Sequence, residues 1–391
     1  MTRGEGVERS FWDRFLFFSQ PLAGMGKNCY LCSLNTMKII RSILFIINVV
    51  LALGLVLTTL SWVVEPSKFI YPSLLAFGYL PMVALNVVMV VLWLLMGRWE
   101  ALLSVAAIAA RWTFLPLFFQ FGGTTKVPPA EEHPYMMTVM TYNVHQFQGD
   151  GKSTPPRDSV AREFVKLVRG QSPDVLCLQE YSAVRGVNIT DSLAVMGYNH
   201  YYGAHTASNG SPYGTTVFSR LPITFVKRID HQKVLVELML EGQRVRLLCL
   251  HMYSYGLDSV DFDAARRMSH GEVQESDRRT LTKVGSTIKE HEREWNELIE
   301  PVLNGNATPT IVAGDMNDIP SSWFYHQITR TMTDTYTEEG SGMGATWNVG
   351  RMMVRIDMVM RSEGLRTLSY RRIKTSLSDH RPVFVALELD N

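Results

Sequence analysis

Asp315 and Asn317 are the two residues whose types and spacing most directly suggest chemistry. They follow the apolar run 311–313 and Gly314, which together predict a buried strand that ends at this point. Residues two apart in an extended chain point to the same side, so both side chains are expected to face one pocket. A carboxylate orients or deprotonates a water molecule, and an uncharged amide holds a phosphate without repelling it. Asp-x-Asn is also common turn chemistry, so the interpretation depends on the other strand ends.

Several other predicted strands end or begin with side chains of the same kinds, in segments 136–147, 174–180, 245–251 and 355–359. The full set of candidate residues is Asn143, Glu180, His251, Asp315, Asn317, Asp357, Asp379 and His380. Oxygen donors without cysteine favour Mg²⁺ or Mn²⁺ over zinc. Two histidines and a carboxylate beside such an ion suit the attack of water on a phosphoester, in which the carboxylate takes the proton of the water.

Each candidate residue also has a purely structural interpretation. His251 is compatible with a core histidine, Asp357 with a salt-bridge partner of Arg355, and Asp379 with a turn or helix cap. Taken singly, these interpretations are the stronger ones. The shared placement of the set at the ends of apolar strands favours the catalytic interpretation instead.

The elements that must position these residues are strands and helices in alternation. Over residues 135–391 this pattern predicts one layered α/β domain. Apolar residues at helical spacing from Val160 to Val168 predict a helix that Asp158 caps. A second set of apolar residues within the charged segment 281–302 predicts a long surface helix that packs on the sheet.

Apolar residues and charges are unevenly distributed along the 391 residues. Residues 1–133 contain 10 Lys/Arg and 7 Asp/Glu with long apolar runs, whereas residues 134–391 contain 28 Lys/Arg and 30 Asp/Glu. The second part therefore lacks the basic surplus expected of a protein that binds the nucleic-acid backbone. Four cysteines do not form a disulfide framework.

The apolar runs before residue 122 predict about three transmembrane helices, at 43–64, 69–96 and 101–121. The first has about 22 residues without charge, enough to cross roughly 30 Å of hydrocarbon. The third contains Arg111, which costs about 3 kcal/mol at mid-membrane unless the side chain reaches the interface or faces a neighbouring helix. Residues 122–134, rich in Gly, Thr and Pro, are expected to form a linker.

The basic residues predict the orientation of this membrane segment. Six of them precede the first span: Arg3, Arg9, Arg14, Lys27, Lys38 and Arg41. The next two loops contain only Lys68 and Arg98, so the amino terminus is expected in the cytoplasm. With three crossings, the α/β domain is expected to lie outside the cytoplasm. The orientation inverts if the third segment does not cross.

Six short motifs give the sequence a family resemblance. TYNV, CLQE, CLH, GDMND, RID and SDHRPV occur in the order and spacing of the endonuclease/exonuclease/phosphatase superfamily, from about residue 137 to residue 389. The chain most resembles the bacterial membrane-anchored members. The resemblance implies a deoxyribonuclease-like four-layer fold, in which two face-to-face β-sheets are flanked by helices and the site lies at one edge of the sandwich.

The resemblance also implies a metal site and its ligands. By motif, Glu180 corresponds to the principal ligand of Mg²⁺ or Mn²⁺, with Asn143 beside it. Asp379 is expected to support the metal or the neighbouring histidine. His145 stands where many anchored relatives have arginine, and no role is assigned to it.

The remaining motif residues correspond to groups that act on the substrate. Asp315 is expected to orient or deprotonate the attacking water, and Asn317 to hold the phosphate. His380 is expected to contact a phosphoryl oxygen, with Asp357 positioning its ring. His251 is expected to bind phosphate or protonate the leaving group. A carboxylate that orients this histidine in some relatives is not identifiable between Tyr198 and Gly214.

These features predict a membrane-anchored, metal-dependent phosphoesterase that acts on a phosphodiester or phosphomonoester. A lipid headgroup or a small phosphoester is the favoured substrate, and no protein partner is implied. One alternative is an extracytoplasmic endonuclease, because basic residues are dense near the C-terminus: Arg361, Arg366, Arg371, Arg372, Lys374 and Arg381. Another is a catalytically silent binding module on the same fold.

Overall fold

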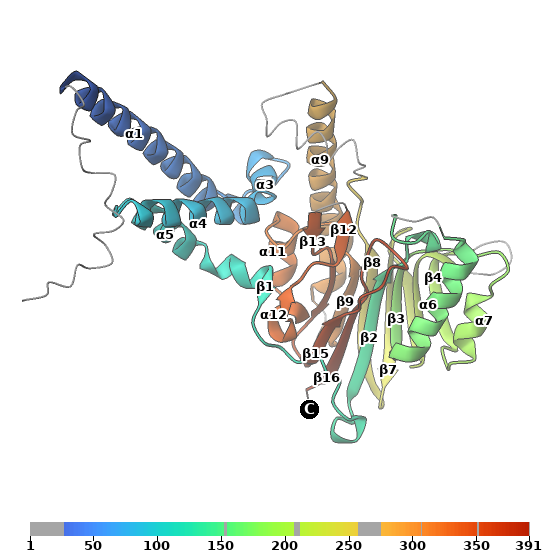
Figure 1. The fold of residues 1–391 in the computed structure, drawn as a ribbon. Helices are drawn as coiled ribbons and strands as arrows, with labels where there is room; N and C mark the ends of the chain where they lie inside the picture. Colours follow the sequence, from blue (N-terminus) through green and yellow to red (C-terminus); the bar gives the residue numbers. More distant parts are fainter. Residues whose placement is uncertain are drawn as a thin grey trace, which may run out of the picture.

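The computed structural model describes residues 27–151, 155–206, 212–256, 275–305, 307–349 and 352–390. Within them, two six-stranded β-sheets pack face to face, helices cover both outer faces, and an N-terminal group of helices lies beside the sandwich (Figure 1). The predicted four-layer fold is therefore confirmed.

One sheet has the strand order β15-β16-β2-β3-β5-β4. Its strands are β2 (Met136–Asn143), β3 (Val175–Tyr181), β4 (His200–Thr206), β5 (Pro212–Ser219), β15 (Leu365–Arg372) and β16 (Val383–Leu389). Strands β2 and β3 are parallel, and the other neighbours are antiparallel. Both faces of β2 and β3 are buried, which explains their almost continuous apolar sequences.

The second sheet has the order β10-β14-β9-β8-β7-β6. Its strands are β6 (Ile223–Arg228), β7 (Lys233–Leu240), β8 (Gln243–His251), β9 (Thr310–Asp315), β10 (Thr333–Asp334) and β14 (Asp357–Arg361). Strands β8 and β9 are parallel, whereas β9 and β14 are antiparallel. Two short pairs complete the described strands: β1 (Phe119–Gln120) with β11 (Gly342–Met343), and β12 (Trp347–Val349) with β13 (Met352–Val354).

The main core lies between the two sheets, where residues such as Val139, Val236 and Val385 are fully buried. The helices that cover the first sheet are α6 (Arg157–Gln171) and α7 (Ile189–Ala194). The second sheet is covered by the π turn Trp295–Ile299, α10 (Glu300–Leu303) and α11 (Trp323–Thr329). Helix α9 (Glu275–Glu294) precedes the π turn, and α12 (Thr335–Glu339) lies at the β10 edge. These layers hold the strand ends in fixed positions.

Two predicted helices differ from the structure in detail. Helix α6 begins at Arg157 after Pro156, and Asp158 lies in its first turn, where it pairs with Arg162 instead of capping the helix. The segment 281–302 is not one uniform α-helix but α9, a π turn and α10. Pro301, which has no backbone N–H to donate, stands in the first turn of α10, directly after the π turn.

The N-terminal helices are α1 (Lys27–Leu57), α2 (Leu60–Val63), α3 (Tyr71–Ala76), α4 (Tyr79–Leu95), α5 (Ala101–Ala110) and the 3₁₀ helix η2 (Trp112–Leu117). Among the described residues, one helical stretch, Thr36–Val63, is long and apolar enough by length and composition to cross a membrane. Helices α4 and α5 are apolar but shorter. They pack on α1 through residues such as Leu55, Tyr79 and Ala107.

The segment 101–121, predicted as one span, has a different structure. Helix α5 ends before Arg111, whose guanidinium lies 3.3 Å from the centroid of the Phe114 ring. The chain continues as the 3₁₀ helix η2, which contains Pro116. Strand β1 then pairs with β11 of the α/β domain. Residues 119–120 therefore belong to the edge of that domain and not to an apolar helix.

Candidate active site

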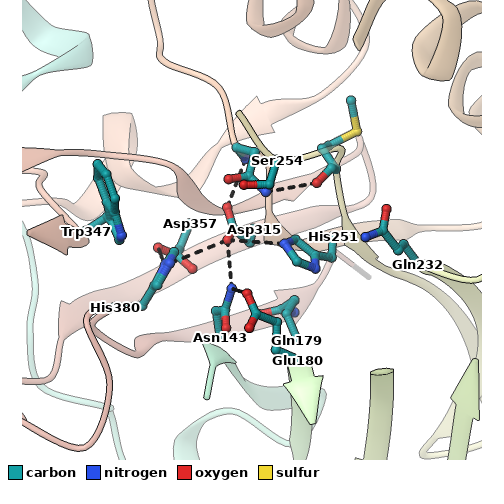
Figure 2. Close-up of polar contacts among 12 residues, drawn as sticks. Asn143, Gln179, Glu180, Gln232, His251, Ser254, Asp315, Trp347, Asp357 and His380 are labelled. Atoms are coloured by element: carbon teal, nitrogen blue, oxygen red, sulfur yellow. Dashed lines mark hydrogen bonds and ion pairs between the residues drawn. The ribbon is translucent and has the colours of Figure 1, made fainter. Parts of the chain in front are cut away.

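Strand register places three candidate residues in one row across the second sheet. Asp315 at the end of β9 is the register partner of His251 at the end of β8, and of Asp357 at the start of β14. Gly314 allows β9 to approach β8 this closely, because a Cβ there would lie 1.9 Å from the carbonyl oxygen of Leu250. The sheet itself therefore brings the two acids and the histidine together (Figure 2).

Asp315 is the centre of the arrangement, and its side chain is almost completely buried. Its Oδ2 accepts a hydrogen bond of 3.0 Å from Nδ2 of Asn143, which comes from the opposite sheet. The same oxygen lies 3.8 Å from Nε2 of His251 and 3.7 Å from Nε2 of His380 (Figure 2). Its Oδ1 accepts a 2.9 Å bond from the backbone N–H of Asn317. One carboxylate thus links both sheets and two imidazole rings.

Asp357 lies behind His380 and holds its ring. The distance from Nδ1 of His380 to Oδ2 of Asp357 is 2.9 Å, and Asp357 is fully buried. The hydroxyl of Thr346 accepts hydrogen bonds from the backbone N–H groups of Ile356 and Asp357, and these bonds hold the start of β14 in place. Burial raises the pKa of Asp357 above its ordinary value, although the positive charge of His380 opposes this shift. Burial lowers the pKa of His380, but the charges of Asp357 and Asp315 outweigh burial and raise it to about 10. His380 is therefore an imidazolium at neutral pH.

Glu180 enters the site from β3 of the first sheet. Its Oε1 accepts a 3.0 Å hydrogen bond from Nδ2 of Asn143, the same amide that donates to Asp315. Its backbone has φ 51°, and the register of β3 against β5 shifts between Leu178 and Tyr181. A left-handed backbone at a residue other than glycine costs about 1–3 kcal/mol and is common at functional positions.

Asn317 and His145 have the same left-handed backbone, with φ 46° and 45°. Asn317 follows Asp315 in the loop after β9, and its Nδ2 donates to the carbonyl oxygen of Met252 at 2.9 Å. Asparagine tolerates this conformation better than most residues. The turn brings the backbone N–H of Asn317 back to the Asp315 carboxylate.

Asp379 occupies the side of the site next to Trp347. Its Oδ2 accepts a 3.0 Å hydrogen bond from Nε1 of Trp347, and its Oδ1 lies 3.5 Å from Nδ1 of His145. Ser378 ties this loop to β2 by donating to the carbonyl oxygen of Asn143. The carboxylate is partly exposed, so it remains accessible from the site.

These side chains border one cavity of about 290 Å³. Of the predicted residues, those that line it are Asn143, Glu180, His251, Asp315, Asn317, Asp379 and His380. Asp357 does not line the cavity and instead supports His380 from behind. The structure therefore brings the whole predicted set together, while the role of each residue stays a prediction.

The sequence did not identify several further residues at the site. Trp347 and His145 contact Asp379. The only sequence signal for a place in the site was that both lie near predicted motifs. His205 and His231 line an adjoining hollow of about 390 Å³, which shares Glu180 and His251 with the first cavity. No local pattern distinguishes these two histidines from surface residues.

The donor atoms of the site suit a hard divalent cation. Asp315, Asp357 and His380 offer atoms that lie within 4.8 Å of one another, and Oδ1 of Asp357 has no hydrogen-bond partner in the part of the chain that the structure describes. However, a protonated His380 has no lone pair for a metal, and its pairing with Asp357 suits proton and phosphate chemistry better. Glu180 and Asn143 provide accessible oxygen donors on the cavity wall, which fit Mg²⁺ or Mn²⁺.

The α/β domain is thus a sandwich of two mixed sheets with outer helices and an acid–histidine site at the common edge of the sheets. Residues 140–380 match the model of the Endonuclease/Exonuclease/phosphatase family, and the chain belongs to this family. Its members are typically dependent on a divalent metal. Residues 41–118 match a second model, described as a domain of unknown function (DUF8431).

Several solved structures are similar to about two thirds of the chain. The endonuclease/exonuclease/phosphatase from Bacteroides vulgatus is 16% identical, with a TM-score of 0.44, and the match covers 65% of this chain and 99% of that one. The protein from Beutenbergia cavernae DSM 12333 is 17% identical, with a TM-score of 0.42 and coverage of 66% and 72%. The human Nocturnin catalytic domain with bound sulfate is 14% identical, with a TM-score of 0.43 and coverage of 68% and 100%. No curated protein matches the chain.

Proposed function

We propose that this protein is a membrane-anchored, divalent-metal-dependent phosphoesterase that activates water to attack a phosphodiester or phosphomonoester. The proposal rests on the position of the Asp315 carboxylate. This group accepts a hydrogen bond from Asn143 of the opposite sheet and lies between the imidazole rings of His251 and His380. A carboxylate held among these donors can orient an attacking water molecule and take its proton.

The hydrolytic step uses three of these side chains. Asp315 accepts the proton of the attacking water as the new bond from oxygen to phosphorus forms. His380, kept protonated by Asp357, donates to a phosphoryl oxygen on which negative charge develops. The bond from phosphorus to the leaving oxygen breaks, and that oxygen takes a proton from His251, which lies on the other side of Asp315.

The metal-binding residues in this proposal are Glu180, Asn143 and Asp379, which line the same cavity. A bound Mg²⁺ or Mn²⁺ would neutralise charge on the phosphoryl oxygens. Asn317 is proposed to hold the phosphate, since it lines the cavity and its amide is held in place by the hydrogen bond to Met252.

Three crossings of the membrane are proposed for the N-terminal helices. Helix α4 has 17 residues, about 26 Å, and α5 with η2 rises about 27 Å. Both lengths are close to the roughly 30 Å of the hydrocarbon core. Many large apolar residues on these helices are exposed, for example Leu53, Val88 and Leu102, which is compatible with contact to lipid.

An ion pair supports the proposed orientation. Arg41 near the start of the first span pairs with Glu100 in the α4–α5 turn, with Nε to Oε1 at 3.1 Å. The α4–α5 turn, whose sequence includes Arg98, lies at the end of the helices that is remote from the α/β domain (Figure 1), and the ion pair places Arg41 at the same turn. By the positive-inside rule this end faces the cytoplasm, so the domain is proposed to face the periplasm of a bacterial inner membrane.

The surroundings of the C-terminal basic residues favour a lipid or small phosphoester over nucleic acid. Arg361 pairs with Glu338 and Arg366 with Glu388, so these charges are balanced within the domain. Arg372 donates to backbone carbonyls. A nucleic-acid-binding surface needs basic side chains that are available to phosphates. The alternative of a silent binding module is weakened because every chemistry-bearing position is filled.

The experiment that tests the proposal measures hydrolysis of bis(para-nitrophenyl) phosphate by the full chain in detergent with added Mg²⁺. Asp315→Asn is expected to lower kcat by about 10²–10⁴-fold, because the amide cannot take the proton of the water. The matched control is Asp158→Asn on the exposed surface of α6, which is expected to keep wild-type turnover. Equal turnover by Asp315→Asn and wild type, or turnover that persists in excess chelator, would contradict the proposal.

A further inference from the structure

One wall of the candidate active site comes from the N-terminal helices. Phe77, between α3 and α4, lines the same cavity as Asp315 and His380. Its ring packs edge-on against Tyr255, with centroids 5.7 Å apart. Ile319, Val354 and Ile356 also line the cavity. The cavity thus has catalytic polar groups and also an apolar lining to which the N-terminal helices contribute.

Hydrogen bonds attach the segment that precedes Phe77 to the loop that follows Asp315. The hydroxyl of Ser321, six residues after Asp315, donates to the carbonyl oxygen of Ala76 at 3.0 Å. The hydroxyl of Ser61 donates to the carbonyl oxygen of Ser321 at 2.8 Å. Both serines are fully buried, so these bonds are not exchanged with water. The position of Phe77 is therefore set by the domain that carries the chemistry.

Further contacts join the residues between Ser61 and Phe77 to helices α9 and α11. The backbone N–H and the hydroxyl of Ser67 donate to the two carboxylate oxygens of Glu292 on α9, at 2.6 and 2.7 Å. The ring of Trp62 stacks on His326 of α11, with centroids 4.5 Å apart. Residues 61–77 are thus anchored at both ends on the α/β domain, close to the site (Figure 1).

The same segment presents aromatic side chains to the exterior. Phe69 and Tyr71 are 54% and 67% exposed, and Phe77 is 39% exposed although it also lines the cavity. The apolar stretch Thr36–Val63 ends within the first residues of this segment, and α4 begins shortly after it. Exposed aromatic residues at the ends of apolar helices are typical of the boundary between lipid and water. The cavity therefore opens beside the place where the helices would enter a bilayer.

We propose that the site takes an amphiphilic phosphoester from the membrane, with its phosphate at Asp315 and His380 and its apolar chain passing over Phe77 toward the lipid. This inference rests on the proposed phosphoesterase function and names its class of substrate. Phe77 is then a specificity-determining residue, because it contacts the part of the substrate that a water-soluble phosphoester lacks.

The experiment compares two diesters with the same reacting group and the same leaving group. Methyl para-nitrophenyl phosphate and hexadecyl para-nitrophenyl phosphate differ only in the length of the alkyl chain. The full chain is assayed in lipid nanodiscs with added Mg²⁺, and the readout is the ratio of kcat/KM for the hexadecyl and the methyl ester. A ratio within one preparation cancels differences in the amount of active protein.

The Phe77→Ala variant is expected to lower this ratio by about tenfold, whereas Phe77→Leu, which keeps an apolar side chain, restores most of it. The matched control is Phe45→Ala. Phe45 lies on α1 and is 40% exposed, close to the exposure of Phe77, but it lines a different hollow beside Arg41 and Glu100. Phe45→Ala is expected to keep the wild-type ratio.

The outcomes separate this inference from the function on which it rests. If the wild type hydrolyses neither ester, the proposed phosphoesterase function fails. If it hydrolyses both but Phe77→Ala leaves the ratio unchanged, or lowers it no more than Phe45→Ala does, the membrane-substrate inference is overturned. A single-stranded oligonucleotide cleaved with a higher kcat/KM than the hexadecyl ester also overturns it.

Discussion

At the scale of single residues, the site depends on how charge is distributed around Asp315. Asn143 donates to Asp315 and to Glu180 with the same amide group, so it couples the proposed proton acceptor to the proposed metal ligand. His380 remains charged because Asp357 is buried directly behind it. Each of these residues would be costly to bury alone, and the hydrogen bonds among them offset part of that cost, although Oδ1 of Asp357 has no partner among the described residues.

Glu180→Gln is expected to weaken Mg²⁺ binding by at least about 10-fold, because the amide keeps the size of the side chain but loses its charge. The measurement is calorimetric titration of the full chain with Mg²⁺, which does not depend on turnover. Glu163→Gln on the surface of α6 serves as the control and should bind Mg²⁺ like the wild type. An unchanged affinity in Glu180→Gln would show that the ion is held elsewhere.

His291 makes the stability of the protein dependent on pH. Burial lowers its pKa, but the hydrogen bond and the charge of Asp318, 3.2 Å away, outweigh burial and raise it above the ordinary value of 6.5. A raised folded-state pKa stabilises the protein fully below about pH 6.5, and this contribution is lost as the pH rises through the folded value. His291→Gln is therefore expected to cost more unfolding free energy at low pH than at high pH.

Urea unfolding of the wild type and His291→Gln in detergent micelles, at about pH 6 and about pH 9, measures this difference. His326→Gln is the control, since burial and the nearby charge of Arg330 lower the pKa of that histidine, which reverses the sign. A stability difference for His291→Gln that grows as the pH rises would contradict the assignment.

At the scale of elements, the site is assembled by the way the strands pair. The parallel pair β8 and β9 ends with His251 opposite Asp315, and the antiparallel pair β9 and β14 begins with Asp357 opposite the same residue. A shift of one residue in either pair would turn these side chains to the other face of the sheet. The packing that fixes the register therefore also fixes the chemistry.

Gly314→Ala tests the importance of this close pairing. The added Cβ would meet the Leu250 carbonyl oxygen at 1.9 Å, and the two strands would have to separate, at a cost of about 3 kcal/mol. The free energy of unfolding and kcat should both fall, and urea unfolding and the diester assay measure them. Gly170→Ala in α6 is the control, because a Cβ there meets nothing within 4 Å and alanine favours a helix by about 1 kcal/mol. Wild-type stability of Gly314→Ala would show that the strands adjust freely.

At the scale of the whole molecule, the N-terminal helices and the α/β domain form one functional unit in our proposal. Ser61, Ser67 and Ala76 make hydrogen bonds to the domain, and Phe77 lines its cavity. The anchor would then do more than retain the enzyme at the membrane, because it would also orient the site toward it.

Glu292→Ala is expected to loosen this connection, because Ser67 loses both of its hydrogen-bond acceptors. Backbone amides in residues 65–77 should exchange hydrogen about tenfold faster, which corresponds to about 1.4 kcal/mol, as measured by mass spectrometry of the full chain in nanodiscs. Glu290→Ala removes only a surface pair with Arg293 and should leave this exchange unchanged. Equal exchange in the two variants would mean that Ser67 does not hold the segment.

The sequence by itself determined the kinds of side chains at the strand ends, the layered α/β class and the family, because apolar runs and short motifs are local signals. It also marked the acids and histidines that the structure gathers around Asp315. Only the tertiary structure decided that Trp347 and His145 contact Asp379 and that Phe77 lines the cavity. The physical reason is that strand register and the docking of the N-terminal helices arise from contacts between residues far apart in the chain, which no local pattern encodes.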